Sequence, residues 1–244
     1  MARTREVAGG GRAVEVEPDR LVGWFARFAD RHGGLAEVDD GDGDEGDAAD
    51  GGAAPEHRSV TAHRVRFRAA DGASAEVALP FGGLPAATEP AEPAAVLDRL
   101  VAHLAVHRRV GIVLVRLGGY SIGVAVGGVV EASTTGARLV HGRTRKGGSS
   151  SGRFARRRDN QARVALDAAA DAVARFLLPV AATLDAVVLG GDTAALDELR
   201  TDRRLTELLA RAEPRVLDVP EPRRVILDEA ARRVLAVEIV VRDR

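Results

Sequence analysis

The chain contains no cysteine, which excludes disulfides, thiol catalysis and zinc–thiolate sites together. Aromatic residues make up only 3% of its 244 residues, so its core must consist mainly of alanine, valine and leucine. No stretch reaches the roughly 18 apolar residues of a membrane span, and the N-terminus lacks the apolar run of a secretory signal. We therefore expect a soluble, cytoplasmic protein without a membrane partner.

The formal net charge is only −1, yet the charges are strongly segregated along the chain. Residues 37–50 hold eight carboxylates and no base, whereas residues 132–158 hold eight cations and no acid. The acidic run superficially resembles a calcium loop, but Glu45 stands where that loop requires glycine and Gly51 where it requires glutamate. The acidic run is therefore predicted to be a disordered, solvated linker.

Hydrophobic periodicity predicts three parts of the chain. These are an N-terminal helical segment over residues 1–36, the acidic linker over 37–57 and one α/β domain over 58–244. In the latter half strands alternate with helices, which favours a sheet covered by helices, and Asp192 is a predicted N-cap. Helices are predicted over 18–32, 94–108, 153–178, 193–210 and 224–237, and strands over 59–69, 74–81, 111–117, 120–133, 137–142, 184–191 and 214–219.

The stretch RTRKGGSSSGRFARRR, residues 143–158, places two glycines and three serines between two clusters of cations. Guanidinium groups bind phosphates and release their counterions, and glycines let the backbone approach a crowded ligand closely. On a helix, residues 153, 156 and 157 share one face. The stretch therefore predicts a nucleic-acid contact, and its competitor is a solvated arginine-rich helix beside a flexible loop. The predicted RNA-binding residues are Arg143, Arg145, Lys146, Arg153, Arg156, Arg157 and Arg158.

Two other motifs match this stretch only in part. A phosphate-binding P-loop would need a lysine where the chain has Gly148. Gly148, Ser150 and Gly152 fit the G-x-S-x-G elbow of serine hydrolases, but all six histidines precede Ser150, whereas the triad histidine of that fold follows the serine. His141 is a candidate general base, although a lone histidine at a strand end is more often structural.

The run KGGSSSGRFARRR resembles the GGQ segment of the eukaryotic and archaeal class I peptide-chain release factors. In that family Gly-Gly-Gln is followed by three residues and then by Arg-Phe-Ala-Arg, which opens a long helix. Gly147 and Gly148 match the two glycines, and residues 153–156 match the run after the gap. The later stretch LDAVVLGGD resembles that domain's next strand and glycine turn. Among relatives, the chain is most similar to the bacterial, actinobacterial-type Vms-like release factors, which are peptidyl-tRNA hydrolases.

The resemblance implies an α/β fold with an RNase H-like mixed sheet flanked by helices, in which the basic Gly/Ser loop leads into a long helix. It also implies a peptidyl-tRNA hydrolase or release-factor-like protein that frees nascent peptide on stalled large ribosomal subunits, in ribosome rescue and quality control. The implied partners are the large ribosomal subunit and the tRNA acceptor end, and no DNA, metal or cofactor is expected. In the release factors, the glycines let the loop enter the peptidyl-transferase centre, where the glutamine helps to position the attacking water.

The chain departs from the family pattern at the glutamine, because that position holds Ser149. A serine hydroxyl can orient a water, but Ser150 and Ser151 have no adjacent base that would make them nucleophiles. The nearest glutamine, Gln161, would lie about 15 Å along a helix that begins near Ser151, too far to share the loop tip. The candidate catalytic residues are Gly147, Gly148, Ser149, Ser150, Ser151 and Gln161.

The sequence is therefore compatible with three functions. The chain is expected to hydrolyse the peptidyl-tRNA ester, to bind tRNA or rRNA as a non-catalytic ribosome-associated factor, or to cleave the tRNA 3′ end as a nuclease. A further alternative is an interaction protein whose basic loop binds its own acidic linker. Only the hydrolase predicts peptide release, whereas the self-binding alternative predicts that deletion of residues 37–50 increases nonspecific RNA binding.

Overall fold

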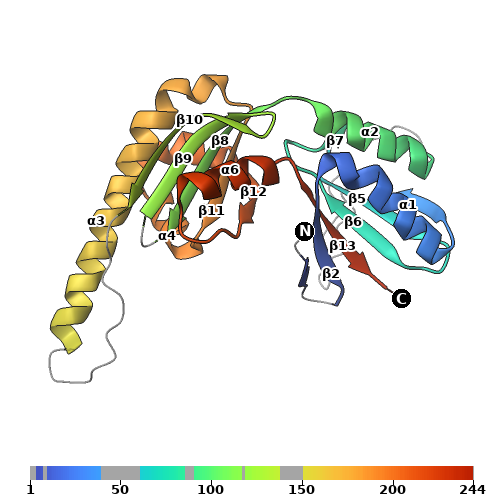
Figure 1. The fold of residues 1–244 in the computed structure, drawn as a ribbon, viewed down its shortest axis with the longest axis horizontal. Coiled ribbons are helices and arrows are strands. Elements are labelled where there is room, and N and C mark those ends of the chain that lie inside the picture. Colours follow the sequence, from blue (N-terminus) through green and yellow to red (C-terminus); the bar gives the residue numbers. More distant parts are fainter. Residues whose placement is uncertain are drawn as a thin grey trace, which may run out of the picture. The chain divides into compact units, whose positions relative to one another are not determined.

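The structure is a computed structural model that describes residues 4–7, 10–39, 61–85, 91–116, 119–137 and 151–243. Within these ranges the side chains of residues 61–62, 137 and 151–162 are not described. The chain divides into two compact units (Figure 1). Unit 1 comprises residues 1–106 together with 235–244, and unit 2 comprises residues 107–234.

Unit 1 is a six-stranded antiparallel sheet with two helices packed on one face. The strand order is β1-β2-β13-β6-β5-β3, and a separate two-stranded sheet joins β4 to β7. The strands are β1 (Thr4–Glu6), β2 (Arg12–Val16), β3 (Leu35–Asp39), β4 (Thr61–Ala62), β5 (Arg64–Ala69), β6 (Ser74–Ala78), β7 (Leu84–Pro85) and β13 (Val237–Arg242). A 3₁₀ turn (Pro18–Arg20) leads into helix α1 (Leu21–His32), and α2 (Pro93–Ala105) follows β7.

The core of unit 1 gathers much of the chain's small aromatic content. Phe25 of α1 packs on Phe67 of β5 with ring centroids 4.4 Å apart, and Trp24 stacks on Phe28 at 5.5 Å. Leu100 of α2 is fully buried in the same cluster. Burial of each large side chain of this kind contributes about 1.5–3 kcal/mol to folding. Both helices are therefore held to one face of the sheet.

The central strand of this sheet, β13, comes from the C-terminal end of the chain and pairs with both β2 and β6. Unit 2 is consequently inserted between α2 and β13. This division differs from the expected single domain over residues 58–244, because β5, β6 and β13 share a sheet with strands of the N-terminal segment. The prediction of a helix over 224–237 was wrong at its end, since α6 stops at Arg233 and a strand begins at Val237. Residues 37–39 of the predicted linker belong to β3, and residues 40–57 lie outside the described residues.

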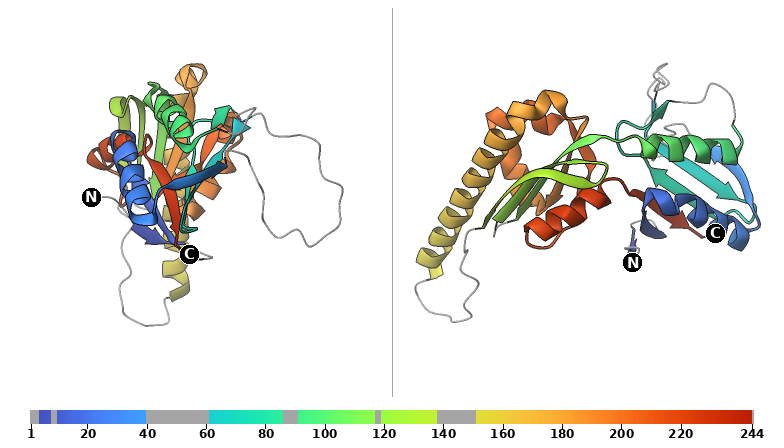
Figure 2. Two further views of the ribbon diagram at one scale, coloured as in Figure 1. Left: turned by 90° about the vertical axis from the view of Figure 1, so that its right-hand side faces the viewer. Right: turned by 45° about the horizontal axis from the view of Figure 1, so that its top comes forward.

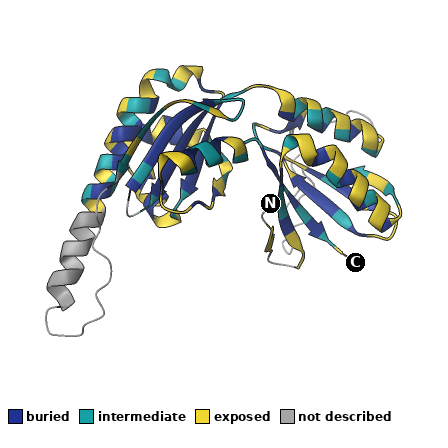
Figure 3. Cartoon of the chain, viewed as in Figure 1, coloured by how far each residue is buried: buried dark blue, intermediate teal, exposed yellow. Residues whose placement is uncertain are grey.

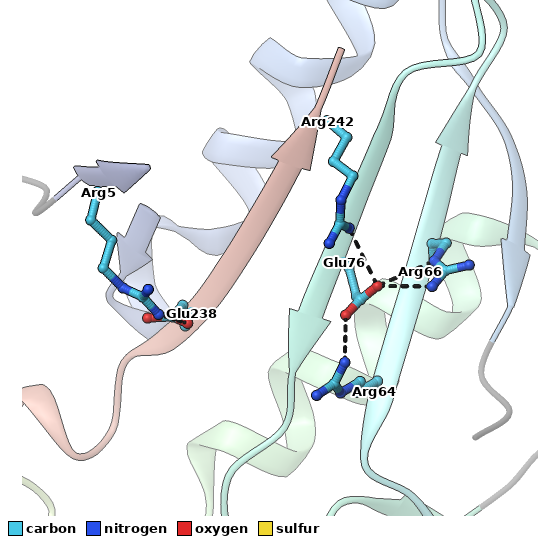
Figure 4. A network of polar contacts seen from close by, with 6 residues as sticks. All are labelled: Arg5, Arg64, Arg66, Glu76, Glu238 and Arg242. Atoms are coloured by element: carbon cyan, nitrogen blue, oxygen red, sulfur yellow. Dashed lines mark hydrogen bonds and ion pairs between the residues drawn. The ribbon is translucent and has the colours of Figure 1, made fainter. Parts of the chain in front are cut away.

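The sheet face opposite the helices carries a nearly buried carboxylate, Glu76, whose side chain is 9% exposed. Its Oε1 accepts a hydrogen bond from Arg64 Nη1 at 3.0 Å and its Oε2 accepts one from Arg66 Nη2 at 2.9 Å (Figure 4). Arg242 Nη1 lies 3.6 Å from the same Oε2. Burial disfavours the charged carboxylate, but the hydrogen bond from Arg66 and the three positive charges outweigh it, so the pKa of Glu76 lies below its ordinary value. The carboxylate thus links β5, β6 and β13.

Unit 2 is a five-stranded mixed sheet with the order β10-β9-β8-β11-β12. Strands β10, β9 and β8 are antiparallel, and β11 runs parallel to both β8 and β12. The strands are β8 (Arg109–Arg116), β9 (Gly119–Val126), β10 (Val129–Ala137), β11 (Ala186–Gly191) and β12 (Ala212–Leu217). The helices are α3 (Ser151–Leu177), α4 (Thr193–Arg200), α5 (Thr206–Ala210) and α6 (Arg224–Arg233), with 3₁₀ turns at Leu178–Thr183 and Arg203–Leu205.

The helices of unit 2 cover both faces of its sheet (Figure 2). Helices α3, α4 and α5 bury their apolar side chains in one cluster with Val113 of β8 and Ile122 of β9. Leu227 of α6 packs on the opposite face, because Gly123 has no Cβ and lets the leucine approach. The predicted α/β fold with a mixed sheet flanked by helices is thereby confirmed.

The sequence prediction missed one hairpin in unit 2. The expected single strand over 120–133 is two strands, β9 and β10, that turn at Gly127 and Gly128. Both glycines have positive φ, 54° and 82°, a conformation that other residues rarely adopt. Strand β10 therefore begins at Val129. Of the strand predicted over 137–142, residues 138–142 lie outside the described residues.

We expect Glu76→Gln to remove the charge that three guanidinium groups share. Because the folded-state pKa of Glu76 is lowered, its ionised form stabilises unit 1 above the unfolded-state pKa, and this contribution disappears as pH falls through the folded-state pKa. At neutral pH the free energy of unfolding should fall by about 2 kcal/mol. Urea denaturation at neutral and acid pH measures both effects.

The matched control is Glu37→Gln, which changes an exposed carboxylate on the edge strand β3 and should cost less than about 0.5 kcal/mol. An equal loss of stability in the Glu76→Gln protein at neutral pH and below the folded-state pKa would contradict the account.

Candidate nucleic-acid interface at the start of helix α3

The predicted site residues fall into two groups. Those at positions 143–150, which include Gly147, Gly148, Ser149 and Ser150, lie outside the described residues. The others lie on α3, whose side chains are described only from Arg163 onward. The structure therefore describes the elements on either side of the site, the end of β10 at Ala137 and the start of α3 at Ser151. The residues placed on the backbone of α3 are Ser151, Arg153, Arg156, Arg157, Arg158 and Gln161.

The candidate segment, residues 138–150, leaves unit 2 at one particular edge of the sheet. Strand β10 is antiparallel to β9, which is antiparallel to β8, so β10 and β8 run in the same direction. Because β11 and β12 also run parallel to β8, β10 ends at the edge where β8, β11 and β12 end. In open α/β sheets this carboxyl edge is where ligands are commonly bound.

Helix α3 has 27 residues and is therefore about 40 Å long. Its described side chains are first buried at Ala165, fourteen residues after Ser151, which is about 21 Å along the helix axis. Figure 1 shows the beginning of α3 projecting beyond the sheet, and Figure 3 shows buried residues where α3 lies over it. The backbone of α3 therefore begins beyond the edge of the sheet of unit 2.

The half of α3 that lies on the sheet is seated by small side chains. Ala169 and Ala172 are 1% and 2% exposed, and they pack in the cluster that includes Val113 and Ile122. Small side chains let the helix axis approach the strands closely. At the exposed side of α3, Asp171 forms an ion pair with Arg204 at 2.8 Å. Among the side chains of α3 from Arg163 onward, the buried ones are Ala165, Ala169, Ala170, Ala172, Val173 and Leu177.

The end of β10 is packed under the chain's only tyrosine. Tyr120 of β9 is the cross-strand partner of Gly136, one residue before β10 ends. A Cβ at Gly136 would lie 2.6 Å from both Cε1 and Oη of Tyr120, so a larger residue would displace the ring or the strand. Neither residue was predicted from the sequence, in which the one available signal was a glycine inside a strand, which often marks a close approach.

The neighbouring strand end is also tightly built. Gly191 closes β11 with φ of +114°, and Asp192 then accepts hydrogen bonds from the N–H groups of Ala194 at 3.0 Å and Ala195 at 3.4 Å. The predicted N-cap at Asp192 is confirmed. At the end of β8, Arg116 Nη1 donates to the carbonyl oxygen of Val219 at 2.7 Å. Hydrogen bonds therefore hold the ends of β8 and β11 at this edge of the sheet.

Side chains that resemble a metal site are not found in the described part of the chain, where no three His, Cys, Asp or Glu residues gather. None of the described helices is long and apolar enough to cross a membrane.

A family model described as "Actinobacteria/chloroflexi VLRF1 release factor" matches residues 108–240, more than half of the chain. The chain belongs to this family. No curated protein matches it. Membership confirms the release-factor resemblance seen in the sequence and indicates a release-factor-like role in translation that involves the ribosome.

The VLRF1 release factor match covers all of unit 2 from its first strand and extends into β13. It therefore includes both β10 and α3 as well as the segment between them. Most of unit 1 lies outside the match, so the assignment to the VLRF1 release factor family concerns the unit that carries the candidate site.

The alanine seat of α3 leads to a prediction for this release factor. Ala169→Leu adds three carbon atoms where the helix meets the sheet, and overpacking should lower the free energy of unfolding by about 2 kcal/mol. The control, Ala182→Leu, makes the same change at an exposed residue of the same unit and should cost less than about 0.5 kcal/mol. Chemical denaturation compares the two variants, and equal stabilities would show that α3 is not closely seated.

Proposed function

We propose that the protein hydrolyses the ester of peptidyl-tRNA on stalled large ribosomal subunits and so releases the nascent peptide for ribosome rescue and quality control. The observation that carries this proposal is the projection of α3, in a member of a release factor family, beyond the edge at which the Gly/Ser segment leaves the sheet. A long projecting element suits a substrate that is enclosed within a large particle.

The covalent geometry sets the distance that this element can span. The segment of 13 residues between β10 and α3 is attached at both ends, so half of it can extend about 20 Å at most. The start of α3, to which one end of the segment is attached, lies about 21 Å along the helix axis from Ala165. This reach supports a site of action well outside the body of unit 2.

The residue types in the segment suit ester hydrolysis with little protein chemistry. Gly147 and Gly148 would let the segment pass close to the tRNA acceptor end, and the hydroxyl groups of Ser149–Ser151 would orient a water. The water attacks the ester carbonyl, which yields the peptide carboxylate and the free 3′-hydroxyl of the tRNA. Most of the rate then comes from positioning within a site that excludes bulk water.

The cations on either side of the glycines have a separate role in this proposal. The seven basic residues between Arg143 and Arg158 would bind RNA phosphates and hold the segment in register. Phosphate contacts of this kind give an affinity that falls steeply with salt.

We expect Gly147→Ala/Gly148→Ala to slow the release of labelled peptide from peptidyl-tRNA on isolated large subunits by about 100-fold or more, because added side chains displace the segment. The control is Gly23→Ala, which changes an exposed helical glycine of unit 1 and should leave release unchanged. The tRNA 3′ end is followed in the same reaction and should remain intact.

Two results would contradict the proposal, and they differ in what they favour. A tRNA shortened at its 3′ end would favour the nuclease. Salt-dependent binding to the large subunit without any release would favour a non-catalytic RNA-binding factor.

A further inference from the structure

Tyr120 lies at the end of β10, one of the two described elements that flank the candidate segment. The aromatic ring extends from β9 across the strand pair and lies over Gly136 of β10, close enough that a Cβ there would be 2.6 Å from Oη. Tyr120 is half-buried and packs against the cluster to which the buried alanines of α3 belong. Helix α3 itself packs against both β9 and β10. The ring therefore contacts the end of β10 and the apolar cluster beneath α3 together.

This contact differs from ordinary core packing because it lies at the end of a strand and leaves little room for a Cβ at Gly136. The ring is rigid and covers the backbone of the penultimate residue of β10, so β10 cannot shift toward α3 without displacing it. At Gly111, at the other end of the same sheet, an added Cβ would meet the buried side chains of Leu184 at 2.9 Å and of Leu177 at 3.6 Å, far from the end of β10. Of these two crowded glycines, only Gly136 lies on β10, so its contact with Tyr120 is the one that can fix the position of the end of β10.

We propose that the contact of Tyr120 with Gly136 is a positioning contact for the release reaction, which fixes the end of β10 relative to α3 and so aims the segment between them. The inference rests on the proposed function. Tyr120 does not touch the reacting atoms in this proposal and acts through the backbone that leads to Gly147 and Gly148.

The test measures peptide release from peptidyl-tRNA on large subunits, with kcat and KM determined separately, at a temperature where every variant is folded. Gly136→Ala and Tyr120→Leu should each lower kcat by about 10-fold or more and change KM less, because Arg153, Arg156 and Arg157 lie on α3 and still bind RNA. Tyr120→Phe keeps the ring and should release peptide at the wild-type rate.

The double variant Gly136→Ala/Tyr120→Leu separates positioning from stability. Loss of the ring makes room for the added methyl group, so the thermal midpoint should recover relative to Gly136→Ala. The aiming contact is still absent, so kcat should stay low. The control Gly123→Ala changes a crowded glycine of β9 on the opposite face of the sheet, under Leu227 of α6, and it should lower the thermal midpoint without a change in kcat.

Recovery of kcat in the double variant would overturn the inference, because the contact would then be structural only. An unchanged kcat in both Gly136→Ala and Tyr120→Leu would also overturn it, while release by the wild-type protein left the proposed function standing. Failure of the wild-type protein to release peptide would overturn the inference and the proposed function together.

Discussion

The seating of α3 on the sheet of unit 2 is the interaction on which the rest of the account depends. Six of the described side chains of α3, four of them alanines, are buried in the second half of the helix, and the helix begins about 21 Å along its axis from Ala165. Because the start of α3 is far from its buried part, a tilt of the helix on the sheet by about 10° would move that start by about 4 Å. Because misplacement by 1 Å can cost about 100-fold in rate, a closely packed seat would serve the proposed release reaction as well as stability.

The candidate segment is attached at both ends, so the end of β10 must be held in place as well as the start of α3. The mixed sheet provides it by ending β10 at the same edge as β8, β11 and β12. The Tyr120 ring over Gly136 and the capped turn at Asp192 keep this edge firm. Unit 1 has its own core, and its central strand β13 is supplied by the chain that follows unit 2. Folding of unit 1 is therefore complete only when residues on both sides of unit 2 are in place.

Sequence patterns predicted the parts of the fold that depend on local order. The start and end of α3 fell within two residues of the expected 153–178, because a run of alanine and charged residues has few breakers. The C-terminal strand β13 was not predicted, and the helix expected over 224–237 ran past the end of α6 at Arg233 to the first residue of that strand. The Gly/Ser segment was recognised from its motif alone. The contact of Tyr120 with Gly136 was beyond prediction, since it depends on the register of two strands and on the rotamer of one side chain.

The central claim is that α3 carries the segment around Gly147 to the acceptor end of tRNA. A photoactivatable cross-linking residue placed at Ser149, with the protein bound to large subunits that carry labelled peptidyl-tRNA, tests it most directly. The account predicts a cross-link from position 149 to the terminal nucleotides of the tRNA and none from the same residue placed at the exposed position of Asp167 on α3. Cross-links from position 149 only to ribosomal RNA or protein remote from the tRNA 3′ end would contradict it.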